Sequence, residues 1–161
     1  MINKLLDSLK LDEAQAHCDI PCGIYDPHLA QLSALTVIRM LDLMADLVAA
    51  HQPGLELYNS MARYVAVKEE HAELLKKEVR VIYGDYFKKE HIDKFPELPT
   101  LVHKIFQLGS KVRQTTSRET ALELLAALNR FAEIFWETKG VATKKAKAPY
   151  KPSEEVVYPV L

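Results

Sequence analysis

The sequence has only two cysteines among its 161 residues, and this scarcity excludes several kinds of metal site. A zinc site usually takes four ligands arranged as separated Cys or His pairs, and no third cysteine is present to begin a second pair. Iron–sulfur clusters need four thiolates and fail for the same reason. A metal held by both cysteines would therefore need backbone or histidine nitrogen to complete its ligand set.

The chain also lacks an excess of charge of one sign and a long apolar run. Its 21 basic and 22 acidic residues give a net charge of −1, which offers no support for nucleic-acid binding. No apolar run approaches the roughly 18 residues of a membrane-spanning helix. The first residues, MINKLLDSLKLDEAQA, lack the continuous apolar core of a secretory signal. We therefore expect a cytoplasmic chain that binds neither nucleic acid nor membrane and keeps its thiols reduced.

Apolar side chains recur at helical spacing in four segments, and no segment shows credible strand alternation. A composition of 48% hydrophobic and 27% charged residues is ordinary for one globular domain with a sizeable core. The predicted helices cover residues 27 to about 50, about 55 to 87, 100 to about 112, and 118 to about 139. Short breaks join them, so the pattern predicts an all-α fold, an antiparallel four-helix bundle.

The two ends of the chain differ from the predicted bundle. Residues 1–16 are amphipathic at helical spacing, which on the residues alone indicates a first helix. Residues 140–161 contain three prolines and four lysines and finish with the apolar segment VVYPVL. We expect them to form an extended C-terminal arm whose end docks on the protein, with a floppy tail as the alternative.

Both cysteines lie in residues 17–27, which read HCDIPCGIYDP. Thiolates together with nitrogen donors suit zinc, copper, nickel or an iron–sulfur cluster. If the chain were cut before His17, its new amine, the Cys18 amide nitrogen and the sulfurs of Cys18 and Cys22 could form a square plane. Ni(II) and Cu(II) prefer that geometry. The His17 imidazole could then reach the metal only along the axis.

The neighbours of the cysteines suit such a chelate. Pro21 has no N–H and so supplies no competing amide, and the free φ of Gly23 lets the chain leave the site sharply. The alternatives are two buried cysteines, a redox-active thiol pair or a short-loop disulfide. A disulfide here would stabilise little, because the entropic gain grows with loop length.

HCDIPCGIYDP closely resembles the nickel hook of nickel-containing superoxide dismutase, a family whose motif reads HCxxPCGxYxP at the mature N-terminus. We call residues 17–27 the hook. The resemblance continues in residues 67–102 and in IFWETK at 134–139, and so covers roughly residues 17–139 in collinear order. It implies one nickel ion per chain. The residues that match the family's metal ligands are His17, Cys18 and Cys22.

The resemblance also implies roles for residues around the metal. Those matching the rest of the hook include Asp19, Pro21 and Gly23. Tyr25 and Tyr86 match two tyrosines beside the open face of the metal, where a phenol can hydrogen-bond water or a small anion. Tyr86 also fits a core tyrosine on the helical stripe. Lys88 matches a lysine near the entrance that would attract an anionic substrate.

Two positions depart from the better-known actinobacterial members, in which a glutamate and an arginine help to fix the hook histidine. The aligned residues here are Ser33 and His71. A serine cannot act as a carboxylate partner, which leaves the orientation of the His17 imidazole open. His71 is the candidate replacement. The remaining histidines have the pattern of surface or packing residues.

The implied activity is disproportionation of superoxide to oxygen and hydrogen peroxide, with nickel cycling between Ni(II) and Ni(III). The resemblance further implies a homohexamer of bundles and a maturation peptidase that removes residues 1–16 to expose His17. Two rival hypotheses use the same hook without turnover: a nickel or copper carrier, and a helical protein with a thiol redox switch. Tyr25 and Tyr86 favour the enzyme over a carrier, because metal delivery needs no anion pocket.

Overall fold

The computed structural model of the chain describes residues 22–50 and 52–161. The predictions for residues 1–21, including the leader and the first part of the hook, lie outside the described residues. The elements are α2 (His28–Ala50), α3 (Leu55–Val81), the π-helical segment η1 (Ile82–Tyr86), α4 (Lys89–Lys94), α5 (Leu98–Gln114), α6 (Arg118–Thr138), β1 (Thr143–Lys147) and β2 (Glu155–Pro159). None of the helices in these ranges is long and apolar enough to cross a membrane.

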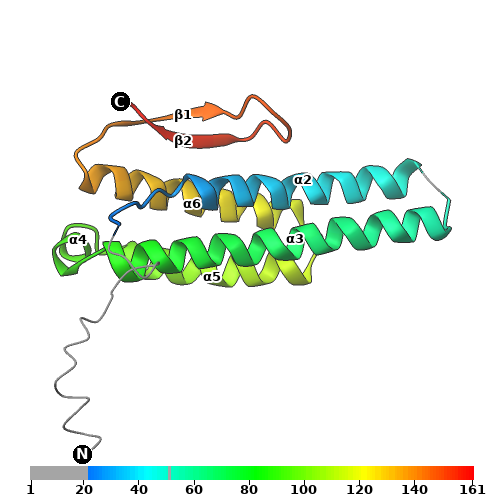
Figure 1. The fold of residues 1–161 in the computed structure, drawn as a ribbon, viewed down its shortest axis with the longest axis horizontal. Helices are drawn as coiled ribbons and strands as arrows, with labels where there is room; N and C mark the ends of the chain where they lie inside the picture. Colours follow the sequence, from blue (N-terminus) through cyan, green and yellow to red (C-terminus); the bar gives the residue numbers. More distant parts are fainter. Residues whose placement is uncertain (1–21, 51) are drawn as a thin grey trace, which may run out of the picture.

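Four long helices form the predicted antiparallel bundle (Figure 1). Helices α2 and α3 run side by side and extend past α5 and α6 at the end of the bundle opposite α4 (Figure 1). The core between them is apolar, and its largest fully buried side chains include Phe131, Phe135, Ile38, Leu75 and Ile105. Burial of such side chains stabilises by about 1.5–3 kcal/mol each, so the apolar stripes provide the main driving force for folding.

Local signals in the sequence set the helix ends. The backbone N–H of His28 donates to Asp26 Oδ1 at 2.7 Å, so Asp26 caps α2 as the Asp–Pro pair predicts. The backbone N–H of Thr120 donates to Ser117 Oγ at 3.1 Å, which confirms Ser117 as the cap of α6. Gly140, with φ of +70°, follows α6 in the left-handed conformation that commonly ends a helix.

The second predicted helix does not stay α-helical to its end. Its last residues form η1, in which the N–H of Phe87 donates to Ile82 O at 3.2 Å. A single π-helical turn inserts an extra residue and shifts the side chains that follow it, and such turns are frequent at functional sites. Phe87 is buried and Tyr86 is half-buried beside it. The expected connection with one helical turn follows, as α4.

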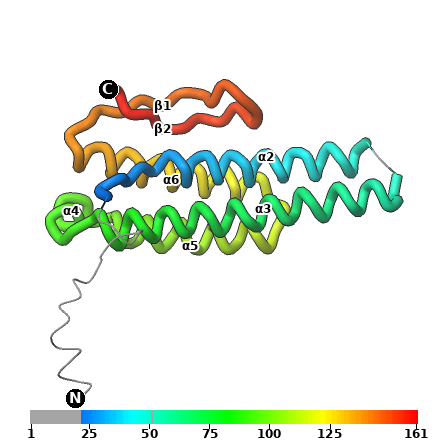
Figure 2. The backbone as a smooth tube through the Cα atoms, in the orientation of Figure 1, coloured from blue at the N-terminus to red at the C-terminus, as the bar shows by residue number. Residues whose placement is uncertain are grey.

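Residues 140–161 form a structure that the sequence analysis did not predict. Instead of one extended arm, β1 and β2 pair as an antiparallel hairpin, from Thr143 opposite Pro159 to Lys147 opposite Glu155. Figure 2 shows the hairpin running along the α2–α6 side of the bundle. The expected docking does occur, because Val156 and Val157 are buried.

Polar contacts fix the hairpin to the bundle. Arg118 of α6 donates to Asp42 of α2 and to Glu154 of the hairpin, each at 2.7 Å. Asn129 Nδ2 donates to the carbonyl oxygen of Glu155 at 2.8 Å, and the side-chain amides of Asn129 and Gln31 also lie 2.8 Å apart. These contacts join α2, α6 and β2, so the hairpin bridges the two helices on which it lies.

We expect Asn129→Ala to lower the free energy of unfolding by about 2 kcal/mol, because the carbonyl oxygen of Glu155 and the buried amide of Gln31 each lose a hydrogen-bond partner. Urea unfolding of the metal-free chain, followed by circular dichroism, measures this. Lys144→Ala, at an exposed position of β1, is the control and should leave the midpoint unchanged. Equal midpoints for the two variants would show that the amide contacts do not hold the hairpin in place.

Candidate metal centre

The described end of the hook leads directly into α2. Cys22 is exposed, so its sulfur can be reached from solvent. Gly23 has φ of +68°, and a Cβ built there would meet no atom within 4 Å. The backbone conformation, rather than lack of space, therefore favours glycine at this position. The turn at Gly23 directs the chain from Cys22 towards Tyr25.

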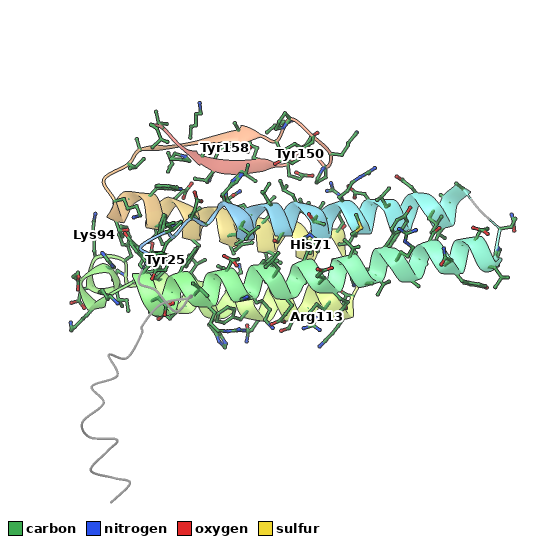
Figure 3. All side chains as sticks on the ribbon, in the orientation of Figure 1. Tyr25, His71, Lys94, Arg113, Tyr150 and Tyr158 are labelled. Carbon is green, nitrogen blue, oxygen red and sulfur yellow. The ribbon has the colours of Figure 1, made fainter. Side chains whose placement is uncertain are left out.

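Tyr25 and Tyr86 come together although they are far apart in the sequence. Their ring centroids are 5.7 Å apart with a tilt of 50°. Tyr25 lies in residues 22–27, the part of the hook that leads into α2, which we call the hook exit. Tyr86 lies in η1, and Figure 3 places Tyr25 at the end of the bundle that carries α4. The two phenols therefore lie beside the point where the hook joins the bundle.

Tyr86 is fixed by contacts on several sides. Its ring stacks on His91 with centroids 5.4 Å apart and an interplanar angle of 8°, and it packs on Phe135 at 4.8 Å. Its hydroxyl oxygen lies 2.7 Å from Thr138 Oγ1. Lys139 Nζ lies 4.9 Å from the ring centroid, within the range of a cation–π contact. Tyr86 is thus both a packing residue and a residue of the candidate site.

Three of the neighbours of Tyr86 were not predicted as site residues from the sequence. His91 was grouped with ordinary surface or packing histidines, and its stacking on Tyr86 is a packing contact at the edge of the site. Thr138 and Lys139 belong to the IFWETK segment of the resemblance, which gave them no role. In the sequence, this polar pair follows the apolar stripe of its helix after one glutamate, which by itself indicates only a helix end.

Lys88 lies next to η1, at the cap of α4. Its side chain is exposed, and Nζ donates to Asp85 O at 2.8 Å. The Lys88 backbone N–H donates to His91 Nδ1 at 3.0 Å, which also orients the ring that stacks on Tyr86. Lys88 and Lys139 therefore carry positive charge near the tyrosine pair.

The structure does not bring His71 to the end of the bundle that carries Tyr25 and Tyr86. His71 lies in the middle of α3, about four turns before Tyr86, or roughly 22 Å at 1.5 Å per residue. Figure 3 places His71 farther along the bundle than Tyr25. Nδ1 of His71 contacts Val67 O at 3.0 Å, and the buried Ser33 donates its hydroxyl to Leu29 O at 2.8 Å. Both side chains thus bond to their own helices.

Of the three predicted metal ligands, Cys22 alone lies within the described residues. His17, Cys18, Asp19 and Pro21 lie outside the described residues. Within residues 22–50 and 52–161, no group of three or more His, Cys, Asp or Glu side chains is placed to hold a metal ion. The donor set itself fits nickel, because thiolates with backbone and amine nitrogens are the strong donors that a square-planar ion prefers.

A family model for nickel-containing superoxide dismutase matches residues 12–139. This chain belongs to the nickel-containing superoxide dismutase family. It is 35% identical to superoxide dismutase [Ni] of Streptomyces seoulensis over 127 residues, covering 79% of this chain and 91% of that protein. It is 36% identical to superoxide dismutase [Ni] of Streptomyces coelicolor over 124 residues, covering 77% and 88%.

Solved structures of family members share the fold. A native nickel superoxide dismutase structure has 35% sequence identity and a TM-score of 0.67, covering 76% of this chain and 99% of that chain. An apo nickel superoxide dismutase structure has 32% identity and a TM-score of 0.65, covering 73% and 98%. The family match ends at residue 139, so the C-terminal hairpin lies outside it.

Proposed function

We propose that this chain is a nickel-dependent superoxide dismutase, which converts two superoxide ions and two protons to oxygen and hydrogen peroxide. The main support is the tyrosine pair: Tyr25, which follows the exposed Cys22 by three residues, lies against Tyr86 in a chain of the nickel superoxide dismutase family. A carrier would need the thiolates but not a pair of phenols beside them. Family membership likewise favours turnover over the carrier and the redox switch.

His17, Cys18 and Cys22 would hold one nickel ion per chain. The donors would be the freed amine of His17, the backbone nitrogen of Cys18 and the two sulfurs, with the His17 imidazole as a further nitrogen donor. When bound there, nickel supplies one-electron exchange with superoxide. The two thiolates and the anionic amide donate charge that favours the higher oxidation state. Asp19, Pro21 and Gly23 would shape the hook around these donors.

The remaining site residues would manage the approach of an anion and its protons. The positive charge of Lys88 would raise the local concentration of superoxide near the hook exit. Lys139 adds a second positive charge beside Tyr86. The Tyr25 hydroxyl would hold a water molecule or small anion near the metal. The Tyr86 hydroxyl would hold a water molecule, and both phenols would limit access of oxidants to the sulfurs.

We further propose that the chain assembles as a homohexamer in which neighbouring copies close the hook. A hook at the end of one bundle is otherwise open to solvent, and Cys22 is exposed in the single chain. His71 lies roughly 22 Å along α3 from Tyr86, beside which the hook joins the bundle, so a hook histidine from another copy would explain how His71 reaches one. His71 would then orient His17 across a subunit interface.

We also propose that the chain is matured by cleavage before it binds the metal. In the cytoplasm, a peptidase would remove residues 1–16 and so convert the amide nitrogen of His17 into an amine. The enzyme then needs reduced thiols for the metal, which a reducing compartment maintains.

A comparison of metals tests the function. The chain beginning at His17 should remove superoxide rapidly when loaded with nickel, as measured by stopped-flow decay of superoxide absorbance. The zinc-loaded chain is the matched control, because zinc has no redox chemistry and should show only background decay. Equal decay rates for the two loaded forms would rule out nickel-dependent turnover.

For Tyr25→Phe we expect a folded, nickel-loaded protein in which azide inhibits at about tenfold higher concentration, because a hydrogen bond to an anion is lost. Tyr83→Phe, at another half-buried tyrosine of η1, is the control and should keep the azide sensitivity of the unaltered chain. Unchanged azide inhibition in Tyr25→Phe would mean that this phenol does not face the anion.

A further inference from the structure

The hydroxyl of Tyr86 belongs to a short series of hydrogen bonds at the end of α6. Tyr86 Oη lies 2.7 Å from Thr138 Oγ1, and Thr138 Oγ1 lies 2.6 Å from the carbonyl oxygen of Phe135. A carbonyl oxygen can only accept, so Thr138 donates its single hydroxyl hydrogen to Phe135. Thr138 Oγ1 must therefore accept its second hydrogen bond from Tyr86.

This direction determines what Tyr86 offers to its surroundings. Its O–H hydrogen is donated to Thr138 of α6 and is not available to a water molecule or an anion. The ring packs on His91, at 5.4 Å, and on Phe135, at 4.8 Å, which keeps the hydroxyl oxygen beside Thr138. The phenol oxygen is left with lone pairs but no hydrogen. Towards the hook exit, Tyr86 is thus a hydrogen-bond acceptor.

We infer that Thr138 is a positioning residue that makes Tyr86 an acceptor at the metal centre. An acceptor binds water or another neutral hydroxyl group by taking its hydrogen, but it repels an anion that needs a donor. Thr138 therefore keeps small anions from binding directly at Tyr86 and favours an ordered water there. The place of Tyr86 at the metal rests on the proposed function, whereas the direction of its hydrogen bond does not.

The direction of the Tyr86–Thr138 hydrogen bond can be measured in the metal-free chain. The intensity ratio of the tyrosine Fermi doublet in the Raman spectrum distinguishes a phenol that donates from one that accepts. Subtracting the spectrum of Tyr86→Phe isolates Tyr86 in each metal-free chain. We expect a donor signal in the unaltered chain and in Thr138→Ser, and its loss in Thr138→Val. An acceptor signal for Tyr86 in the unaltered chain would overturn the inference.

The effect on anions is measured in the nickel-loaded chain beginning at His17. Thr138→Val frees the Tyr86 hydrogen, so azide should inhibit at about tenfold lower concentration. Thr138→Ser should keep the original sensitivity. Thr36→Val is the matched control, because the Thr36 hydroxyl donates to Leu32 O at 3.1 Å within a helix but does not contact Tyr86.

A second comparison, in a chain that already carries Tyr86→Phe, separates a positioning role of Thr138 from a general structural effect. If Thr138 acts through Tyr86, Thr138→Val should not change azide inhibition further in a chain that also carries Tyr86→Phe. An equal change in both backgrounds, or none in either, would contradict the inference. If the unaltered nickel-loaded chain lacked dismutase activity, the proposed function would fail, and the metal-free Raman result would still decide the direction of the bond.

Discussion

A chain that retains Met1 to Ala16 should fold its helices but lack native nickel coordination and dismutase activity. While Ala16 is joined to His17, the nitrogen of His17 is an amide, which is weakly basic and cannot act as the amine ligand. The bundle does not depend on the metal, because its stability comes from buried side chains such as Phe131 and Phe135. Cleavage at the Ala16–His17 bond should restore activity when nickel is supplied.

The measurement compares chains whose first residue is verified by mass spectrometry. Far-ultraviolet circular dichroism should give the same helix content for both forms, while superoxide decay should be fast only for the chain beginning at His17. A chain with one additional residue before His17 is the matched control and should again be inactive. Full activity in a chain that retains Met1 to Ala16 would overturn the role of the amine, even with nickel bound.

Replacing either hook cysteine with serine should abolish activity in the processed chain. Each thiolate is half of the sulfur donor set, and a hydroxyl is a poor substitute at a site built for soft donors. We expect Cys18→Ser and Cys22→Ser each to lower turnover by more than about 100-fold, beyond the 10–100-fold typical for loss of a residue that only supports a metal ligand.

Nickel content and fold distinguish the causes of that loss. Elemental analysis should find little nickel in either variant, while the helix content should equal that of the unaltered chain. Ser33→Ala is a control that removes a hydroxyl bonded only to Leu29 O in the described contacts, and it should retain nickel and activity. Near-native turnover in Cys18→Ser or Cys22→Ser would contradict the assignment of the ligands.

The helices of the bundle were predictable because their signals are local. Apolar spacing marks each stripe, and Asp26, Ser117 and Gly140 mark helix ends by chemistry that acts within one turn. The helix that includes Tyr86 was less predictable at its end. An extra residue in a π-helical turn changes the spacing only once, which a periodic pattern over many residues does not resolve.

The C-terminal hairpin was missed for a different reason. Strand β1 reads TKKAK, whose exposed lysines give no alternation of apolar and polar residues. The hairpin depends on contacts far away in the sequence, such as Arg118 with Glu154 and Asn129 with Glu155. Neither propensity nor spacing can indicate such pairs in a single sequence.

The candidate site was predictable only in part. The chelating chemistry of the hook follows from its residues, but only the family resemblance joined Tyr25 to Tyr86. Periodicity placed Tyr86 on a core stripe, and its ring does pack on Phe135. Its hydroxyl meets Thr138, a contact between two helices that no local pattern indicates. The role of His71 stays a prediction, because it depends on a neighbouring copy.

Elemental analysis and superoxide decay, measured on the same preparation of the chain beginning at His17, test the central claim most directly. The account predicts nickel approaching one ion per chain, and a dismutase rate that rises in proportion to nickel content and falls when a chelator removes the metal. A preparation that is fully loaded with nickel yet removes superoxide no faster than its metal-free form would contradict it.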